Sequence, residues 1–294
     1  MEKAVYHFPG LFEFYEFYRK FLPIYREKTE YFYDWCQIGS LYGAPADCLW
    51  AGGRVSTGNA DPRQVLALTE EYGLSARLTF SNSLLCPEHL KDPKCNRLCA
   101  LFGAEPGNGV IVHSELLLAY LKVKYPNFYF VSSTTKVLTD FEDLAAETER
   151  PDFRYVVPDF RLNKVFDRLA GLKEKRKVEF LCNECCWPGC RKRKECYENV
   201  SRKNLGERCP DHICAAPEGE KGYRFSAAMK NPAFIGIRDI RETYLPMGFS
   251  QFKIEGRGLG SAMLLEFILY YLTKPEYQLP LREEMYLDSM LDLF

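Results

Sequence analysis

Short apolar segments alternate with longer amphipathic ones along most of the 294-residue chain. The short segments are rich in β-branched and aromatic residues, and most of them are followed by a polar residue or a glycine. This pattern is typical of buried parallel strands. Eight such segments are expected to form strands, at residues 36–42, 76–81, 110–113, 128–132, 153–157, 177–182, 234–238 and 251–255.

Amphipathic segments with helical periodicity lie between many of these strands. An aromatic-rich helix is expected at residues 10–33, and further helices at residues 61–72, 93–102, 114–124, 162–172 and 260–272. Eight strands alternating with helices over about 220 residues favour an α/β, TIM-like (β/α)8 barrel over an open doubly wound sheet. The expected barrel forms a single domain of residues 1–294, with an N-terminal helix and a cysteine-rich insertion after strand 6.

Polar residues gather where the predicted strands end. In a barrel of this kind the ligand site lies at the carboxyl ends of the strands. A small polar or aromatic substrate is therefore expected to meet these side chains, although serine and asparagine also commonly cap helices. The candidate substrate-binding residues are Tyr42, Asn82, His113, Ser133 and Asn183.

Charged residues at the ends of the last two predicted strands are the candidate catalytic residues. They are Arg238, Glu255 and Arg257. An arginine can bind a carboxylate through two parallel hydrogen bonds. Glu255 can equally form a structural ion pair with Arg257, so both roles stay open.

Composition narrows the class of protein. The net charge is −1, which disfavours a protein that coats nucleic acid electrostatically. No apolar run approaches the roughly 18 residues of a membrane helix, and the N-terminus lacks the apolar core of a signal peptide. We therefore expect a cytoplasmic protein without a membrane span.

Cysteines supply the strongest chemical signal. The chain has 12 cysteines, and in a reducing compartment they are not expected to form a disulfide framework. The segment 182–214 holds seven of them at short spacings, and thiolates at such spacings can converge on zinc or on an iron–sulfur cluster. The basic residues within this segment would offset the negative charge of a thiolate-bound metal.

Two segments resemble the peptidase U32 family. GFSQFKIEGR at residues 248–257 is similar to the family signature G-[VI]-x-x-[FL]-K-I-E-G-R, and residues 178–197 are similar to its strand followed by N-E-x-C-x-x-x-C and a basic run. The resemblance implies a TIM-like barrel and, in several branches, a [4Fe–4S] cluster held by four cysteines. By position it implies the ligands Cys186, Cys190, Cys209 and Cys214, with Cys182 and Cys196 in reserve.

The resemblance also orders the possible functions. It favours an iron–sulfur redox enzyme, such as an oxygen-independent hydroxylase, of the kind found in related branches, and zinc remains the alternative metal. A second possibility is a metal-containing accessory or RNA-binding barrel that works with a partner subunit of the same family and has no chemistry of its own.

A U32-type peptidase is the third possibility. The chain lacks the H-G-[AS]-[LM]-C-x-x-x-S-G-x-C run and the C-terminal extension of the collagenase-like members. Its four histidines also leave little room for a catalytic triad.

Overall fold

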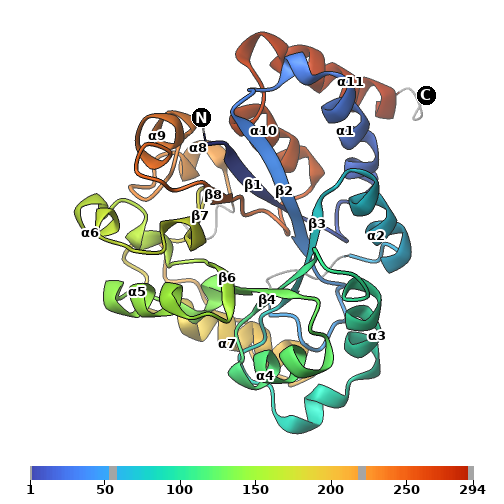
Figure 1. The fold of residues 1–294 in the computed structure, drawn as a ribbon, viewed down its shortest axis with the longest axis vertical. Helices are drawn as coiled ribbons and strands as arrows, with labels where there is room; N and C mark the ends of the chain where they lie inside the picture. Colours follow the sequence, from blue (N-terminus) through green and yellow to red (C-terminus); the bar gives the residue numbers. More distant parts are fainter. Residues whose placement is uncertain (1, 53–57, 218–222, 291–294) are drawn as a thin grey trace.

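Eight parallel strands form the centre of the computed structural model, which describes residues 2–52, 58–217 and 223–290. Their order in the sheet is β6-β5-β4-β3-β2-β1-β8-β7. Val156 pairs with Val178 and joins the two outer strands, so the sheet closes into a TIM-like barrel as predicted (Figure 1). The strands are β1 (Ala4–Pro9), β2 (Cys36–Gly43), β3 (Ser75–Phe80), β4 (Gly109–Val112), β5 (Tyr129–Ser132), β6 (Phe153–Val156), β7 (Glu179–Leu181) and β8 (Gln251–Lys253).

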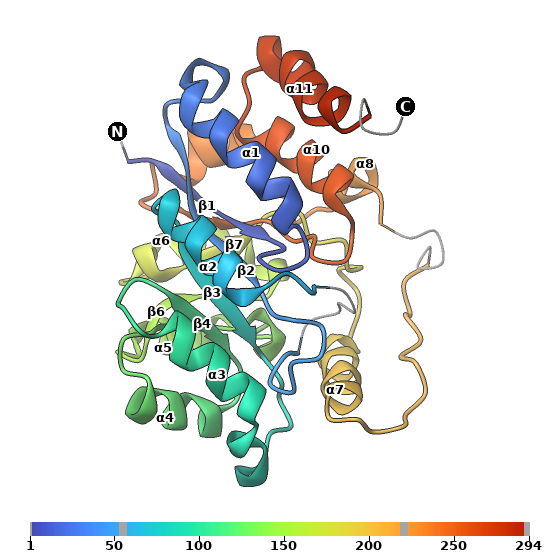
Figure 2. The same ribbon diagram turned by 90° about the vertical axis from the view of Figure 1, so that its right-hand side faces the viewer.

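Helices surround the barrel, and α7 lies with the cysteine-rich segment to one side of it (Figure 2). None of the described helices is both long and apolar enough to cross a membrane. The helices are α1 (Tyr15–Glu27), α2 (Pro62–Glu71), α3 (Pro93–Phe102), α4 (Glu115–Lys124), α5 (Phe141–Glu149), α6 (Phe166–Ala170), α7 (Arg193–Asn204), α8 (Phe225–Ala228), α9 (Ile237–Asp239), α10 (Ser261–Tyr271) and α11 (Gln278–Met290).

Two strand assignments differ from the prediction. β1 precedes the N-terminal helix and pairs with both β2 and β8. The predicted strand at residues 234–238 is wrong, because its second half forms the short helix α9. Gly236 there approaches Tyr270 so closely that an added Cβ would lie 2.9 Å from the Tyr270 hydroxyl. The cysteine-rich segment consequently follows the seventh strand rather than the sixth.

Successive side chains along each strand face alternately outward, toward the helices, and inward, toward the centre of the barrel. Phe252 and Ile254 face the large apolar core between the strands and the helices. Gln251 and Lys253 alternate with these residues, so they face the inside of the barrel, where they are buried. Inside the barrel, a small apolar layer consists of Tyr42, Ile111, Val131, Val157 and Leu181. Charged and polar side chains occupy the rest of the barrel interior, and one of them, Lys253, lines the cavity described next.

Candidate functional site

A cavity of about 300 Å³ opens at the carboxyl ends of the strands, where ligand sites of such barrels lie. Lys253 is the last residue of β8, and Glu255 and Arg257 follow it along the chain. β2 contributes Tyr42, and the segment after β5 contributes Ser133. The structure thus brings four of the predicted site residues, Tyr42, Ser133, Glu255 and Arg257, to one cavity.

The cavity ends inward on a buried ionic group. The Glu179 carboxylate accepts a 2.5 Å hydrogen bond from Arg77 Nη1 and lies 3.3 Å from Lys253 Nζ. His7 completes the group, with Nε2 at 3.5 Å from Glu179. All four side chains are almost fully buried. Since an unpaired charge in such a place is very unfavourable, Glu179 is essential to the two cations.

Lys253 is the member of this group that faces the cavity. Its Nζ lies 4.0 Å from the centroid of the Tyr42 ring. The Tyr42 hydroxyl donates a 2.6 Å hydrogen bond to the Ile254 carbonyl, which fixes the ring over the ammonium group. Burial lowers the pKa of Lys253 from its usual 10.5 to about 8, although the Glu179 carboxylate opposes this shift.

Asn183 positions Glu255. Its side chain accepts a 2.7 Å hydrogen bond from the Glu255 amide and donates a 3.0 Å bond to the Glu255 carbonyl. Asn183 itself is fully buried and does not line the cavity. Its place in the structure therefore indicates that it orients the backbone that follows β8.

Arg257 is held at the cavity by Glu13. Arg257 Nε donates to Glu13 Oε1 at 2.7 Å, and Nη2 donates to the Ala44 carbonyl at 3.1 Å. The remaining nitrogen, Nη1, is buried and has no hydrogen-bond partner in the part of the chain that the structure describes. A buried donor without a partner is costly, so this nitrogen is suited to bind an acceptor on a ligand.

Hydroxyl groups form the opposite wall. Thr135 Oγ1 donates to Ser133 Oγ at 2.9 Å, and His113 Nδ1 lies 2.8 Å from the same Thr135 oxygen. Burial, followed by the nearby Lys136 charge, lowers the pKa of His113 to about 4. Ser133 and Thr135 line the cavity, whereas His113 contacts it through Thr135.

Besides Asn183 and His113, two further predicted site residues, Asn82 and Arg238, lie outside the cavity lining. Asn82 is buried and binds the carbonyls of Leu49 and Ser201, so it joins the segment after β3 to α7. Arg238 lies on α9 with 84% of its side chain exposed and pairs with Glu242. The mistaken strand at residues 234–238 explains why the sequence placed Arg238 at the rim.

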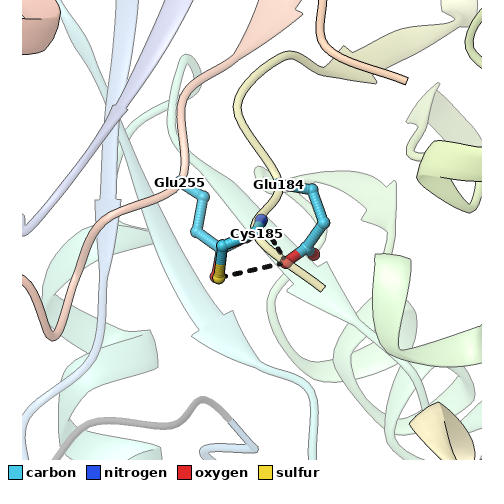
Figure 3. A group of neighbouring side chains, drawn as sticks. All are labelled: Glu184, Cys185 and Glu255. Atoms are coloured by element: carbon cyan, nitrogen blue, oxygen red, sulfur yellow. Dashed lines mark hydrogen bonds between the residues drawn. The ribbon is translucent and has the colours of Figure 1, made fainter. Parts of the chain in front are cut away.

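Three donor atoms converge where β7 gives way to the cysteine-rich segment (Figure 3). They belong to Glu184, Cys185 and Glu255, and lie within 4.8 Å of one another, close enough to share a cation. The Cys185 amide donates to Glu184 Oε1 at 3.0 Å. Cys185 and Glu255 also line the cavity, so this trio connects the cavity with the cysteine-rich segment.

The predicted cysteine ligands lie around α7. Cys190 precedes this helix, and its carbonyl accepts a 2.9 Å hydrogen bond from Arg161. Cys209 follows the helix, and its sulfur lies 3.6 Å from Asn199 Nδ2. Cys186 and Cys196 are half-buried, Cys214 is exposed, and Cys182 is fully buried beneath the barrel surface.

These cysteines do not form a compact site of the mononuclear type. A tetrahedral zinc with Zn–S bonds of about 2.3 Å holds its sulfurs about 3.8 Å apart. Within residues 2–52, 58–217 and 223–290, no three cysteine sulfurs lie within 4.8 Å of one another. The described cysteines therefore form no preassembled tetrahedral zinc site.

Comparison with known proteins supports the fold. No protein-family profile matches the chain, and no curated protein sequence matches it. The structure of the U32 peptidase Mk0906 is similar, with a TM-score of 0.55 and 15% sequence identity. The alignment covers 88% of this chain and 94% of that one. The chain therefore has a U32-like barrel fold, as the KIEGR segment indicated.

Proposed function

We propose that this chain is a U32-like iron–sulfur enzyme that acts on a small organic substrate, as an oxygen-independent hydroxylase or a related redox enzyme. The observation that carries the proposal is the position of Cys185. Its side chain lines the cavity beside Glu255, and the next residue, Cys186, is the first proposed cluster ligand. Substrate and cluster would thus be neighbours.

The surroundings of α7 suit a negatively charged cluster. Arg193 is buried between Glu184 and Asp159, and Arg161 binds the Cys190 carbonyl. These two guanidinium groups would stabilise thiolates at Cys186 and Cys190. The proposed ligands are Cys186, Cys190, Cys209 and Cys214, and Cys196 in the first turn of α7 remains the reserve.

Cys182 is left out of the ligand set. It is fully buried, and its thiol donates to the Phe180 carbonyl at 3.6 Å. Burial raises the pKa of Cys182 well above its usual value, which opposes the thiolate form that a metal requires. The residue therefore belongs to the apolar core.

When bound, the cluster would donate electrons to the substrate in a reduction or accept electrons from it in an oxidation. The chain's own residues would bind and orient that substrate. Arg257 would bind an acceptor group through Nη1, while Tyr42 and Lys253 define the inner wall of the cavity. Glu255, oriented by Asn183, would hold or release a proton beside the substrate.

Anaerobic purification tests this function. The protein should be brown, show the broad visible absorption of a [4Fe–4S] cluster and contain about four iron atoms per chain. Cys186→Ser and Cys190→Ser should lose most of this iron. Cys86→Ser is the matched control, because Cys86 is also half-buried but lies outside the cysteine-rich segment. Iron-free protein with one zinc per chain, or equal iron loss in Cys86→Ser, would contradict the proposal.

A peptidase is the second candidate, and the hydroxyl wall is the observation that favours it. The contacts from His113 through Thr135 to Ser133 reach the cavity, and the similar solved structure is a U32 peptidase. Peptide hydrolysis by metal-free protein, abolished in Ser133→Ala and Thr135→Ala, would support this alternative. Absence of hydrolysis by the unmodified protein would remove the alternative, and hydrolysis that survives both substitutions would exclude the hydroxyl wall as its basis.

A further inference from the structure

Lys253 is buried with few partners. Its side chain is 6% exposed, and its one hydrogen bond among the described residues, to Glu179 Oε1, measures 3.3 Å. An ammonium group has three donors. The Tyr42 ring covers one side of Nζ, and the cavity lies along another. A buried amine with so little hydrogen bonding is suited to contact a ligand.

The main partner of Glu179 is Arg77 rather than Lys253. The distance from Arg77 Nη1 to Glu179 is 2.5 Å, which is 0.8 Å shorter than the contact from Lys253. Tyr129 and Tyr155 pack against the Arg77 guanidinium and keep it in place. If Lys253 lost its charge, Glu179 would still have a close cationic partner. The structure can therefore tolerate chemistry at the lysine nitrogen.

We propose that Lys253 forms an imine with a carbonyl ligand, and that this ligand is a 2-oxo acid with an apolar side chain. The inference rests on the proposal that the cavity is the active site, but it does not require an iron–sulfur cluster. A lysine amine that is largely removed from water is a recurring nucleophile toward carbonyl carbon.

The cavity specifies both ends of such a ligand. Arg257 Nη1 has no hydrogen-bond partner among the described residues and would donate a hydrogen bond to the carboxylate. Ile111, Leu181 and Leu259 give the cavity an apolar wall for the side chain. The carbonyl carbon between the carboxylate and the side chain would then meet the lysine.

The step is balanced without a further reactant. The unprotonated amine of Lys253 attacks the carbonyl carbon, so that a C–N bond forms and the carbonyl π bond breaks. The proton displaced from nitrogen and one proton from the neighbouring Glu255 or water allow the oxygen to leave as water. The product is a protonated C=N bond to Lys253, and no electrons are exchanged with any oxidant.

Reductive trapping tests the inference. The anaerobically purified protein is incubated with 4-methyl-2-oxopentanoate and cyanoborohydride, and its peptides are analysed by mass spectrometry. Lys253 should gain the mass of the probe less water plus two hydrogens, at least about tenfold faster than an exposed lysine. Lys173, whose side chain is 79% exposed, is the internal reference. Labelling no faster at Lys253 than at Lys173 would overturn the proposal.

Two variants sharpen the result. Lys253→Arg keeps a positive charge beside Glu179 but cannot form an imine, so its labelling at position 253 should vanish. Arg257→Lys keeps a cation beside Glu13 but lacks Nη1, so it should slow labelling by the 2-oxo acid. The same variant should leave labelling by 3-methylbutanal, which has no carboxylate, almost unchanged. Equal slowing with both probes would refute the role of Arg257 in binding the acid.

The iron content of each sample separates this inference from the proposed function. Labelling of Lys253 in iron-free protein would support the imine and count against the iron–sulfur enzyme. Iron-loaded protein without labelling would support the iron–sulfur enzyme and count against the imine.

Discussion

His7 shows how the barrel interior controls the charge of a single residue. Its Nδ1 lies 2.8 Å from Ser40 Oγ, and its Nε2 lies 3.0 Å from Gln251 Oε1. The charged groups that face it are Arg77, Glu179 and the more distant Lys253. Burial, followed by the Arg77 charge, lowers the pKa of His7 from 6.5 to about 3. The imidazole is therefore neutral at physiological pH.

Replacement of His7 should flatten the acid side of the stability curve. As the pH falls below 6.5, His7 gains a proton in the unfolded chain but not in the folded protein until about pH 3. The free energy of unfolding should therefore decrease as the pH falls through this range, by up to about 1.4 kcal/mol per pH unit. In His7→Gln this contribution is absent.

Urea unfolding between pH 6.5 and 4.5 measures the effect. Above pH 4.5 most carboxylates remain ionised in the unfolded chain, so His7 dominates the difference between the two proteins. His113 is present in both proteins, so its contribution to the pH dependence cancels from the difference. Parallel stability curves for wild type and His7→Gln would show that His7 is not held neutral.

Sequence reasoning found some site residues and missed others for a physical reason. Glu255 and Arg257 follow a recognisable strand, so their place at the rim could be predicted, and both line the cavity. Lys253 was not singled out, although a lysine at an inward position of a short buried strand is an unusual residue that merits attention. Its significance comes from Glu179, Arg77 and Tyr42, which belong to distant parts of the chain.

The helix α3 depends on its first residues. Asp92 caps it by accepting a 2.7 Å hydrogen bond from the Cys95 amide, and Pro93 occupies the first turn, where no amide hydrogen is needed. These local signals explain why residues 93–102 could be predicted as a helix from sequence.

Removal of this cap should destabilise the protein. Asp92→Ala leaves the first-turn amides without their acceptor and should lower the free energy of unfolding by about 1 kcal/mol. Asp92→Asn keeps an acceptor oxygen and should recover most of the loss. Chemical denaturation of the three proteins gives the comparison, and equal stability of Ala and Asn variants would exclude capping as the cause.

Elements without such local signals were harder to predict. β1 carries an ordinary mixed sequence, AVYHFP, and its strand conformation depends on neighbours at residues 36–42 and 251–253. Residues 234–238 have strand-like composition but lack a pairing partner in the ladder. Seven of the eight predicted strands were correct because their apolar runs, unlike these two segments, agree with the final pairing.

At the scale of the whole molecule, β1 completes the barrel. It lies between β2 and β8 and hydrogen-bonds to both. Without it, the edges of β2 and β8 would be exposed and the apolar side chains Tyr6 and Phe8 would leave the core. The barrel therefore has no obvious substitute for this strand.

Deletion of residues 1–9 should abolish cooperative folding. The shortened chain is expected to bind hydrophobic dyes and to lose its thermal unfolding transition, as followed by circular dichroism. A chain that lacks only the residues before Ala4 should retain the transition, because the ladder begins at Ala4. A cooperative transition after the longer deletion would show that the barrel closes without β1.

The pairing of β1 with β8 has a consequence for biosynthesis. His7 and Gln251, which are in contact, are separated by 244 positions in the chain. At a synthesis rate of roughly 5–20 residues per second, the first strand waits about 12–50 seconds for its second neighbour to leave the ribosome. During that interval the nascent chain carries an open sheet edge, which makes it a natural client for chaperones that bind extended apolar segments.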